Sequence, residues 1–551
     1  MSNSHRRGPG APVEKAKDFK GSIGKLARYM SEYKLALVFV VIFAITSTVF
    51  NIIGPKLMGN ATTEIFNGII AKVNGTGDVN FDTLGAILLL LIGFYLISSI
   101  CSFIQGWLMT GVSQKVSYRL RKELIAKINR LPMNYFDRST NGEALSRVTN
   151  DVDTLAQNLN QSITQLVTSI TTIIGVLVMM LSISPLMTLV AILILPVSLA
   201  LVLIVVKISQ KYFKSQQEYL GHINGQVEEV YGGHNIIKAF NREERVIKDF
   251  DEANDILYKS AWKSQFFSGI MMPVMTFVGN LGYVGVAVLG GLLAANGTIM
   301  VGDILSFIQY VKNFTQPITQ MAQVSSMLQS TAAAAERVFE FLAEDEEEQC
   351  AKEHAMLTDT SGNTRNVTTL DITGDVTFEH VRFGYNPEKI IINDFSARVR
   401  QGQKIAIVGP TGAGKTTIVK LLMRFYELNG GRILIDGYDI ADFDRSELRE
   451  LFGMVLQDTW LFKGSIMENI RYGKLDATDD EVIAAAKAAH VDHFIRTLPG
   501  GYDMELNEEA SNVSQGQKQL LTIARAILAN NKILILDAVS YTHLRAHETG
   551  R

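Results

Sequence analysis

The hydrophobic pattern divides the chain into two parts. Before about residue 330, apolar residues form long uncharged runs, and after it charged and apolar residues alternate over short distances. The uncharged runs are Leu35–Ile53, Leu84–Trp107, Gln161–Val206 and Gly269–Ala295. Each is long enough for a helix to cross a bilayer core of about 30 Å, and Ser184-Pro185 splits the third run into two spans. A weaker run at 302–326 contains Lys312, so the pattern predicts six membrane helices in a transmembrane domain at 35–328.

Lysine and arginine in the connecting segments favour one orientation. The first 34 residues contain eight of them, segment 111–160 contains eight and segment 207–268 contains nine, whereas segment 54–83 contains two and segment 296–301 none. Basic residues accumulate in cytoplasmic connections. Both termini, including the N-terminal segment 1–34, are therefore predicted to be cytoplasmic. No apolar segment follows the first charges closely, so a cleavable signal peptide is not expected.

The two basic connections are long and carry helical patterns, such as Val116, Leu120 and Leu124. Half of a connection of about 50 residues reaches roughly 35 Å as a helix. We expect membrane helices to continue into the cytoplasm, turn near Asn134–Gly142 and Gly232–Asn241, and return. Two ordinary cytoplasmic loops remain the alternative.

From Thr368 onward the pattern changes to short β-rich runs that alternate with helical ones. This alternation predicts an α/β sheet with crossover helices. A linker is expected at 329–367, and its acidic run Glu344–Glu348 is expected to be a solvated surface. The expected strands are Val376–Arg382, Lys404–Val408, Arg432–Ile435, Gly453–Leu456 and Lys532–Leu536, and the expected helices are Thr416–Glu427, Asp479–Ala489 and Gln515–Ala529.

A phosphate-binding motif lies between an expected strand and an expected helix. It fits G-x-x-x-x-G-K-[ST] at every fixed position. The glycines let the backbone direct N–H groups at phosphate oxygens, and the helix N-terminus adds partial positive charge. Lys415 is expected to reach the outer phosphates and Thr416 to bind Mg²⁺. The residues of this candidate ATP site are Gly409, Pro410, Thr411, Gly412, Ala413, Gly414, Lys415, Thr416 and Thr417.

An aspartate follows a second expected strand. Ile533–Leu536 is apolar and ends at Asp537, which is the arrangement that delivers a carboxylate to a Mg²⁺ site beside a phosphate loop. Alone the pattern is weak, because many core strands end in aspartate. After a phosphate loop it predicts that Asp537 is a metal-site residue.

Three further motifs resemble those of ABC transporters. Val513-Ser514-Gln515-Gly516-Gln517 resembles the signature motif Leu-Ser-Gly-Gly-Gln, with Gln515 at the place of the first glycine. Gln457 matches the Q-loop, which the family uses as a sensor and Mg²⁺ ligand. Tyr385 matches the aromatic residue that stacks on adenine. Six spans with two long cytoplasmic excursions resemble the exporter-type half-transporter. The resemblance runs from about residue 20 to Asp537.

The resemblance implies an α-helical six-span transmembrane domain followed by an α/β P-loop ATPase domain at 368–537. In this family each ATP lies between the phosphate loop of one chain and the signature motif of a second half-transporter chain. The expected function is ATP-driven export of small amphiphilic or hydrophobic substrates across the cell membrane, although import stays open. Gln515 slightly favours a heterodimer over a homodimer. The net charge of −3 gives no reason to expect nucleic acid.

The residue after Asp537 departs from the family pattern. The family has a catalytic glutamate there, whereas this chain has Ala538, so no catalytic residue is assigned. His543 and His547 come too soon to be the family's switch histidine, and no D-loop is recognisable. We expect 538–551 not to be the native continuation, the ATPase domain to be truncated, and the chain as written not to hydrolyse ATP. The alternative is a nucleotide-binding, non-hydrolysing regulatory subunit of a heterodimeric transporter.

Overall fold

The structure is a computed structural model that describes residues 16–347, 356–358, 364–366, 372–386, 389–410, 412–456, 459–507 and 512–537. The side chains at 141, 194, 195, 197–199, 202, 315, 319 and 322 are not described. The chain divides into two units. The first contains the described residues up to Asn129 and Asn141–Glu344, and the second contains Arg130–Thr140 and the described residues from Asp345 onward.

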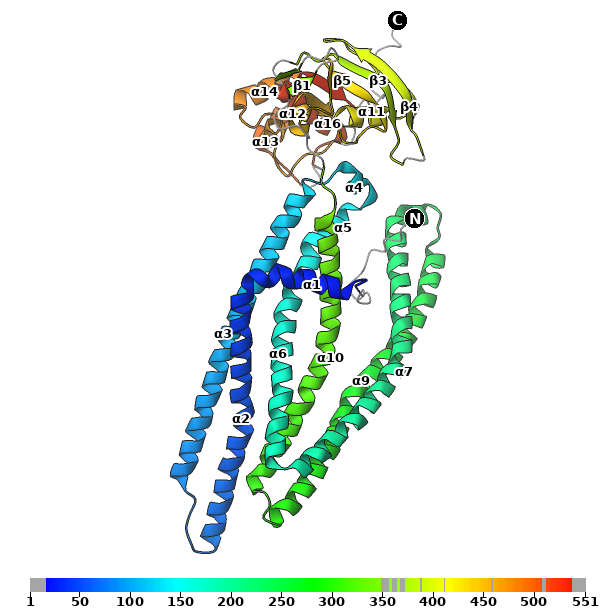
Figure 1. Ribbon diagram of the computed structural model, residues 1–551. Helices are drawn as coiled ribbons and strands as arrows, with labels where there is room; N and C mark the ends of the chain where they lie inside the picture. Colours follow the sequence, from blue (N-terminus) through cyan, green and yellow to red (C-terminus); the bar gives the residue numbers. More distant parts are fainter. Residues whose placement is uncertain are drawn as a thin grey trace. The chain divides into compact units, whose positions relative to one another are not determined.

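The first unit is helical (Figure 1). Asp18 caps the short helix α1 by accepting a hydrogen bond from the Gly21 N–H. The unit consists of α1 (Phe19–Met30), a 3₁₀ turn (Ser31–Tyr33), α2 (Lys34–Val73), α3 (Phe81–Ile128), α5 (Asn141–Ser146), a π-helical turn (Arg147–Asp151), α6 (Val152–Ile183), α7 (Pro185–Gly232), α8 (His234–Ala239), α9 (Glu243–Ala295) and α10 (Val301–Ala343).

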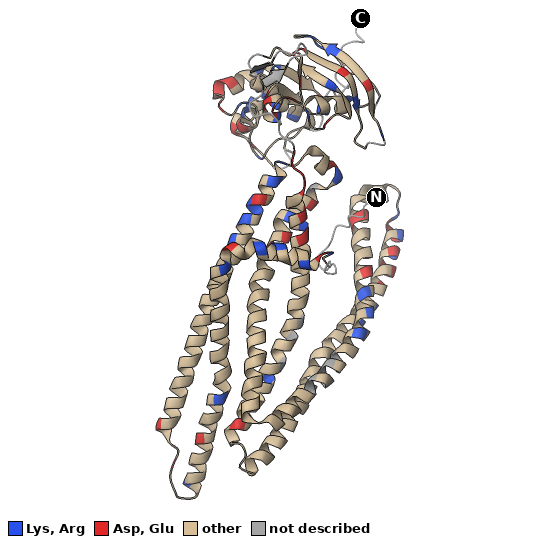
Figure 2. Cartoon of the chain, viewed as in Figure 1, with Lys and Arg blue, Asp and Glu red and all other residues tan. Residues whose placement is uncertain are grey.

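The long helices continue well beyond the apolar runs, as the sequence predicts. Helix α3 extends to Ile128, although its uncharged run ends at Trp107. Figure 2 shows most of the charged residues of α3, α7 and α9 gathered toward one end of each of these helices. In the described part, four helical stretches are long and apolar enough to cross a membrane: Phe19–Val73, Phe81–Ile128, Gly142–Ile183 and Glu243–Ala295. The spans expected at 186–206 and 302–326 lie in α7 and α10, and the count of six stays a prediction.

The helices of this unit pack in pairs, α2 on α3, α7 on α9 and α6 on α10. Helices α2 and α10 approach very closely, because a Cβ atom on Gly302 would lie only 1.8 Å from the Gly59 carbonyl oxygen. Small residues allow this kind of backbone contact in membrane helices. Two hydroxyls of α10 satisfy carbonyls beside Pro55, since Ser306 donates to the Pro55 oxygen at 2.8 Å and Tyr310 to the Ile52 oxygen at 2.9 Å.

The second unit combines an antiparallel sheet, a parallel strand pair and a group of helices. The sheet has the order β4-β3-β5-β6, and β7 pairs with β10 in parallel. The strands are β1 (Met356–Thr358), β2 (Thr364–Asn366), β3 (Val376–Phe383), β4 (Ile392–Val399), β5 (Gly430–Ile435), β6 (Tyr438–Asp439), β7 (Phe452–Val455), β8 (Gly464–Ser465), β9 (Glu505–Leu506) and β10 (Ile533–Leu536). The helices are α4 (Met133–Arg138), α11 (Lys415–Leu422), α12 (Arg445–Glu450), α13 (Ile466–Arg471), α14 (Asp479–Ala488), α15 (Asp492–Thr497), a 3₁₀ turn (Gly501–Asp503) and α16 (Gln515–Ala529).

Two apolar clusters hold this unit together. One joins the antiparallel sheet to α11, α12 and the β7–β10 pair, with Leu421, Ile433 and Leu448 almost fully buried. The other joins α13, α14 and α16 through Ile470, Val482 and Leu521. The first cluster includes Ile418, Leu421 and Leu422 of α11, the helix that follows the phosphate loop, and the second includes Val513, just before α16, and Leu521 within it. The helix after the phosphate loop and the helix after the signature turn are therefore each packed into an apolar cluster of their own.

The strand predicted at Lys404–Val408 is wrong. These residues form no strand, and Ile405, Ile407 and Val408 are exposed. A strand forms only where a neighbour accepts its backbone hydrogen bonds, and no described strand pairs with this segment. The other four expected strands are confirmed within one or two residues, and α16 has its predicted bounds. The helix expected at Thr416–Glu427 ends at Leu422, shortly before Arg424 takes the left-handed conformation (φ 51°).

Candidate nucleotide-binding site

The phosphate loop, residues Gly409–Thr416, leads directly into α11. Gly412 and Gly414 both have φ of 86°, a region that only glycine adopts without strain, and Gly414 is the N-cap residue. The Lys415 ammonium donates to the carbonyl oxygens of Gly409 at 2.7 Å and Pro410 at 3.0 Å. This folded loop holds Lys415 beside the N-terminus of α11, where unpaired N–H groups favour an anion.

The two expected metal-site side chains meet at the same place. The Thr416 hydroxyl donates to Asp537 Oδ1 at 3.3 Å, although the residues lie 121 positions apart. Asp537 follows β10, and its N–H donates to the Val455 carbonyl at 2.9 Å, which continues the parallel pairing of β10 with β7. A hydroxyl and a carboxylate side by side are hard oxygen ligands of the kind that Mg²⁺ prefers.

Tyr385 lies in an aromatic cluster beside the start of α11, directly after the phosphate loop. Its ring contacts Phe383 and Tyr426 edge-on, with both pairs of ring centroids 5.1 Å apart. Its hydroxyl lies 3.3 Å from the Thr417 hydroxyl, so it shares a surface with the start of α11. The side chain is 40% exposed, which leaves one part of the ring free to stack on a planar ligand.

The signature turn, residues Val513–Gln517, begins α16. Ser514 accepts from the Gln517 N–H at 3.4 Å, and Gln517 accepts from the Ser514 N–H at 2.7 Å, which is a complete capping box. Val513 is buried, whereas Ser514, Gln515 and Gly516 are exposed. Gln515 donates to the Thr459 hydroxyl at 3.2 Å. In the described residues, no hydrogen bond joins the signature turn to the phosphate loop of the same chain.

Three predicted positions lie outside the described residues: Thr411, Gln457 and Ala538. The structure places Leu456, the residue before Gln457, directly after β7. Of the predicted site residues, the structure brings together Lys415, Thr416, Thr417, Asp537 and Tyr385. The signature turn makes no described hydrogen bond to this group, and its residues Ser514, Gln515 and Gly516 are exposed.

Comparison with known proteins decides the family. The model of the ABC transporter transmembrane region matches residues 37–318, and the ABC transporter model matches residues 392–540. The fatty acid ABC transporter ATP-binding/permease protein of Mycobacterium tuberculosis is 42% identical over 557 residues, which covers 96% of this chain and 86% of the relative.

The chain belongs to the ABC transporter family. Its resemblance to an exporter-type half-transporter, with a transmembrane region fused to an ATP-binding domain, is thereby confirmed. The uncharacterized ABC transporter ATP-binding protein YfiC of Bacillus subtilis is 41% identical over 524 residues and covers 95% of this chain and 83% of the relative. The ATP-dependent lipid A-core flippase of Desulfotalea psychrophila is 31% identical over 518 residues, which covers 94% of this chain and 86% of the relative.

The family assignment establishes the general function of the chain. The chain is a multi-pass membrane protein with an ATP-binding domain, and it is an ATP-driven transporter subunit that works with a second half-transporter chain. The geometry of the phosphate loop agrees with this, because Lys415, Thr416 and Asp537 gather at one edge of the ATP-binding domain.

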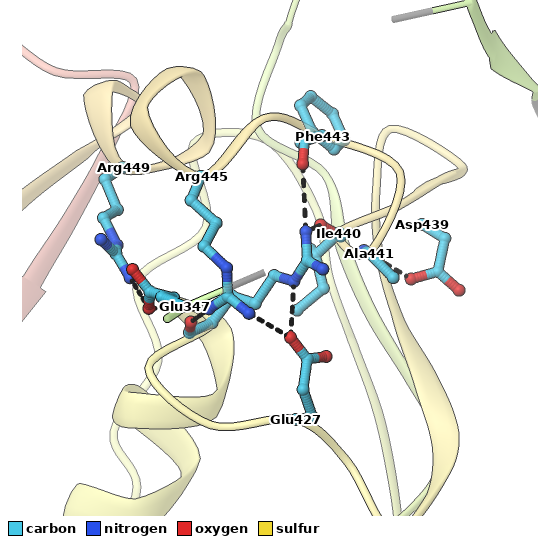
Figure 3. A network of polar contacts seen from close by, with 9 residues as sticks. Glu347, Glu427, Asp439, Ile440, Ala441, Phe443, Arg445 and Arg449 are labelled. Carbon is cyan, nitrogen blue, oxygen red and sulfur yellow. Dashed lines mark hydrogen bonds and ion pairs between the residues drawn. The ribbon is translucent and has the colours of Figure 1, made fainter. Parts of the chain in front are cut away.

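The ABC transporter chain also contains a buried ion-pair network that the sequence did not reveal (Figure 3). Arg445 is 4% exposed and donates to Glu347 Oε1 at 2.9 Å, to the Arg424 carbonyl at 2.5 Å and to Glu427. Arg449 donates to the same Glu347 oxygen at 2.7 Å. The expectation that the whole acidic run 344–348 is a solvated surface is therefore wrong for Glu347, whose side chain is only 10% exposed.

Burial acts on the charges of this network. It lowers the pKa of the Arg445 guanidinium, while the charge of Glu347 opposes that change. Burial also raises the pKa of the Asp439 carboxyl, which accepts from the Ala441 N–H at 2.9 Å. The network joins the segment that follows α10 to α12 and to the segment between α11 and β5. No pattern in the sequence pairs Glu347 with Arg445, because 98 residues separate them.

The turn between α3 and α5, which contains α4, belongs to the same unit. The Tyr426 hydroxyl donates to Asp137 Oδ2 at 2.5 Å, and Asp137 lies in α4. Burial, together with this carboxylate, raises the pKa of the Tyr426 hydroxyl. Because Tyr426 also contacts Tyr385, one aromatic cluster connects α4 with the candidate adenine site.

Replacing Tyr385 with alanine is expected to weaken ATP binding by up to roughly tenfold, because aromatic stacking contributes about 0.5–1.5 kcal/mol beyond buried area. Tyr385→Phe keeps the ring and loses only the contact with Thr417, so its affinity should stay close to that of the unchanged chain. Titration with a fluorescent ATP analogue measures both variants. Equal losses in both would show that the hydroxyl, and not the ring, supports binding.

Proposed function

We propose that this chain exports small amphiphilic or hydrophobic substrates across the cell membrane by alternating access coupled to ATP. Its relatives include proteins named for fatty acids and for lipid A-core flipping, and both are amphiphiles. The observation that carries the proposal is the convergence of Lys415, Thr416 and Asp537 in a chain that also has membrane-length apolar helices. The comparisons do not favour a purely regulatory subunit.

In this proposal each side chain of the site has one role. Lys415 binds the outer phosphates, and the glycines of the phosphate loop let backbone N–H groups surround them. Thr416, Asp537 and Gln457 hold Mg²⁺, directly or through water, and the metal neutralises phosphate charge. Tyr385 stacks on the adenine. The loop and the start of α11 complete the site with Gly409, Pro410, Thr411, Gly412, Ala413, Gly414 and Thr417.

The second half of each site comes from another chain. The signature turn, with exposed Ser514, Gln515 and Gly516 and half-buried Gln517, is proposed to cover the ATP that lies on the phosphate loop of the partner. A Cβ atom added to Gly516 would meet no other atom within 4 Å, so that surface is open to a ligand. Two half-transporter chains are therefore needed, and Gln515 slightly favours a heterodimer over a homodimer. Both termini and the ATP-binding domain are proposed to be cytoplasmic.

ATP hydrolysis needs a group that ATP binding does not, a side chain that positions the attacking water. The position after Asp537, where the family has a catalytic glutamate, is Ala538 in this chain. A methyl group cannot orient the attacking water or accept its proton. We expect purified chain in nanodiscs to bind ATP but to release phosphate no faster than its Lys415→Ala variant, measured with a phosphate sensor. Phosphate release well above that background would show that another group replaces the glutamate.

A transporter differs from a membrane-anchored ATP-binding protein because ATP binding changes the affinity of its substrate site. Purified chain in nanodiscs is titrated with a fluorescent fatty acid, with and without ATP and Mg²⁺. ATP should change the affinity for the probe by about 5- to 150-fold, the usual range of coupling between two binding sites. The Lys415→Ala variant should bind the probe with the same affinity in both conditions. An affinity that ATP leaves unchanged, although ATP itself binds, would refute the proposed function.

A further inference from the structure

Helix α10 has a polar face within the predicted sixth span. Gln309, Lys312, Gln316, Gln320 and Gln323 follow one another at steps of three or four residues, so they share one side of the helix. Gln309, Lys312, Gln316 and Gln323 are exposed, and Gln320 is half-buried and accepts from the Ser169 hydroxyl at 3.4 Å. The other side of the same turns carries Phe307, Tyr310 and Phe314, which are buried.

Such a face is costly if it lies against lipid. The amides of Gln309 and Gln323 and the Lys312 ammonium would lose hydrogen bonds to water in a hydrocarbon environment, and a lysine is among the most unfavourable residues at the centre of a membrane helix. The aromatic side of α10 already packs against other helices of the first unit, α2, α6, α7 and α9. The polar side of α10 is therefore directed at something other than lipid.

The charged residues of the predicted spans indicate the chemical class of a ligand that would cover this polar face. In the six predicted spans the sequence contains only two charged residues, Asp303 and Lys312. Asp303 is neutralised, because the Lys56 ammonium donates to its Oδ1 at 2.6 Å. Within the described part of the chain, Lys312 forms no ion pair. The spans thus carry one positive charge that no acidic side chain among the described residues balances.

We propose that the polar face of α10 binds the anionic head group of an amphiphilic substrate, with Lys312 as its charge partner. The Lys312 ammonium would donate to a carboxylate or phosphate oxygen, and the side-chain amide of Gln309 would donate to another oxygen of the same group. This inference rests on the proposed function and narrows its substrate class from amphiphiles in general to anionic ones. A neutral or cationic amphiphile would leave the ammonium unpaired.

The test uses purified chain in nanodiscs of zwitterionic lipid, without nucleotide. Three fluorescent probes with the same alkyl chain, ending in a carboxylate, an alcohol or an amine, are titrated into four proteins. The proteins are the unchanged chain, Lys312→Gln, Lys312→Glu and Lys207→Gln. Lys207 is an exposed lysine on α7 outside the polar face, so Lys207→Gln removes one positive charge without touching the proposed site.

The unchanged chain should bind the carboxylate at least tenfold more tightly than the alcohol, since a hydrogen bond to a charged group contributes about 1.5–3 kcal/mol. Lys312→Gln should remove that preference, Lys312→Glu should reverse it toward the amine, and Lys207→Gln should keep it. ATP affinity is measured in parallel and should be equal in all four proteins.

Two results would overturn the inference. A carboxylate preference that survives in Lys312→Gln would place the anion elsewhere. A change in the association of chains, seen by mass photometry, with unaltered probe binding would assign Lys312 to an acidic group of the partner chain. Both differ from failure of the proposed function itself, in which ATP would have no effect on probe affinity in the unchanged chain.

Discussion

Replacing Lys415 with alanine is expected to lower ATP affinity by roughly a hundredfold. Hydrogen bonds to charged groups contribute about 1.5–3 kcal/mol each, and Lys415 carries the one formal positive charge of the phosphate loop. Its ammonium donates to the Gly409 and Pro410 carbonyl oxygens, at 2.7 and 3.0 Å, and phosphate oxygens would take over these hydrogen bonds. Binding of a labelled ATP analogue to chain in nanodiscs measures the loss.

Lys404→Ala is the matched control, because Lys404 is an exposed lysine just before the loop. Its affinity for ATP should stay within about twofold of the unchanged chain, since an isolated surface charge contributes little. Equal losses in Lys415→Ala and Lys404→Ala would show that only overall charge matters. An unchanged affinity in Lys415→Ala would place the nucleotide at another site.

Replacing Arg445 with methionine is expected to destabilise the ATP-binding domain by about 3–5 kcal/mol, the usual cost of removing one partner from a buried ion pair. The change would leave Glu347, which is 10% exposed at its side chain, with Arg449 as its remaining donor here, and would remove the Arg445 donor to the Arg424 carbonyl. Methionine fills much of the same volume, so the loss of stability would come mainly from the lost charge and not from a cavity. Hydrogen exchange of peptides across α12 and β5 in the full chain measures the local opening free energy.

Arg398→Met is the control for that measurement. Arg398 pairs with Asp375 at 3.1 Å but is 65% exposed, so its loss should cost less than about 1 kcal/mol. A similar small effect of Arg445→Met would show that water enters the network around Glu347 and screens it. Arg445→Lys should give an intermediate loss, because an ammonium cannot reach Glu347, Glu427 and the Arg424 carbonyl together.

The sequence predicted those parts of the site that depend on neighbours along the chain. The phosphate loop, α16 with its capping serine, and the aspartate after β10 all carry local signals, and the structure has each of them where expected. The meeting of Thr416 with Asp537 followed only from the assumption that the motifs belong together. The structure supplies that contact at 3.3 Å.

Other features depended on contacts between distant segments and could not be predicted. β-propensity suggested a strand at Lys404–Val408, but a strand also needs a partner, and none pairs with it among the described strands. Strand β4 was missed because its run Ile392–Val399 includes Asn393, Asp394 and Arg398, which weaken the apolar alternation. Glu347 looked like one residue of a solvated acidic run, and only the fold brings Arg445 and Arg449 to it.

The most direct measurement of the central claim is a cross-link between two chains across the ATP. One chain carries Ala413→Cys in the phosphate loop and the other carries Gln515→Cys in the signature turn, and both positions are exposed. Cys101 and Cys350 are replaced by serine in both chains. Mixed in nanodiscs under mild oxidation, the two chains should form a disulfide-linked dimer when ATP and Mg²⁺ are present. Either chain alone, or a mixture whose phosphate loop carries Lys415→Ala, should form little of it. No cross-link in the presence of ATP would show that two copies of this chain do not enclose ATP together, as a heterodimer predicts, whereas a cross-link that forms equally well without ATP would contradict the account.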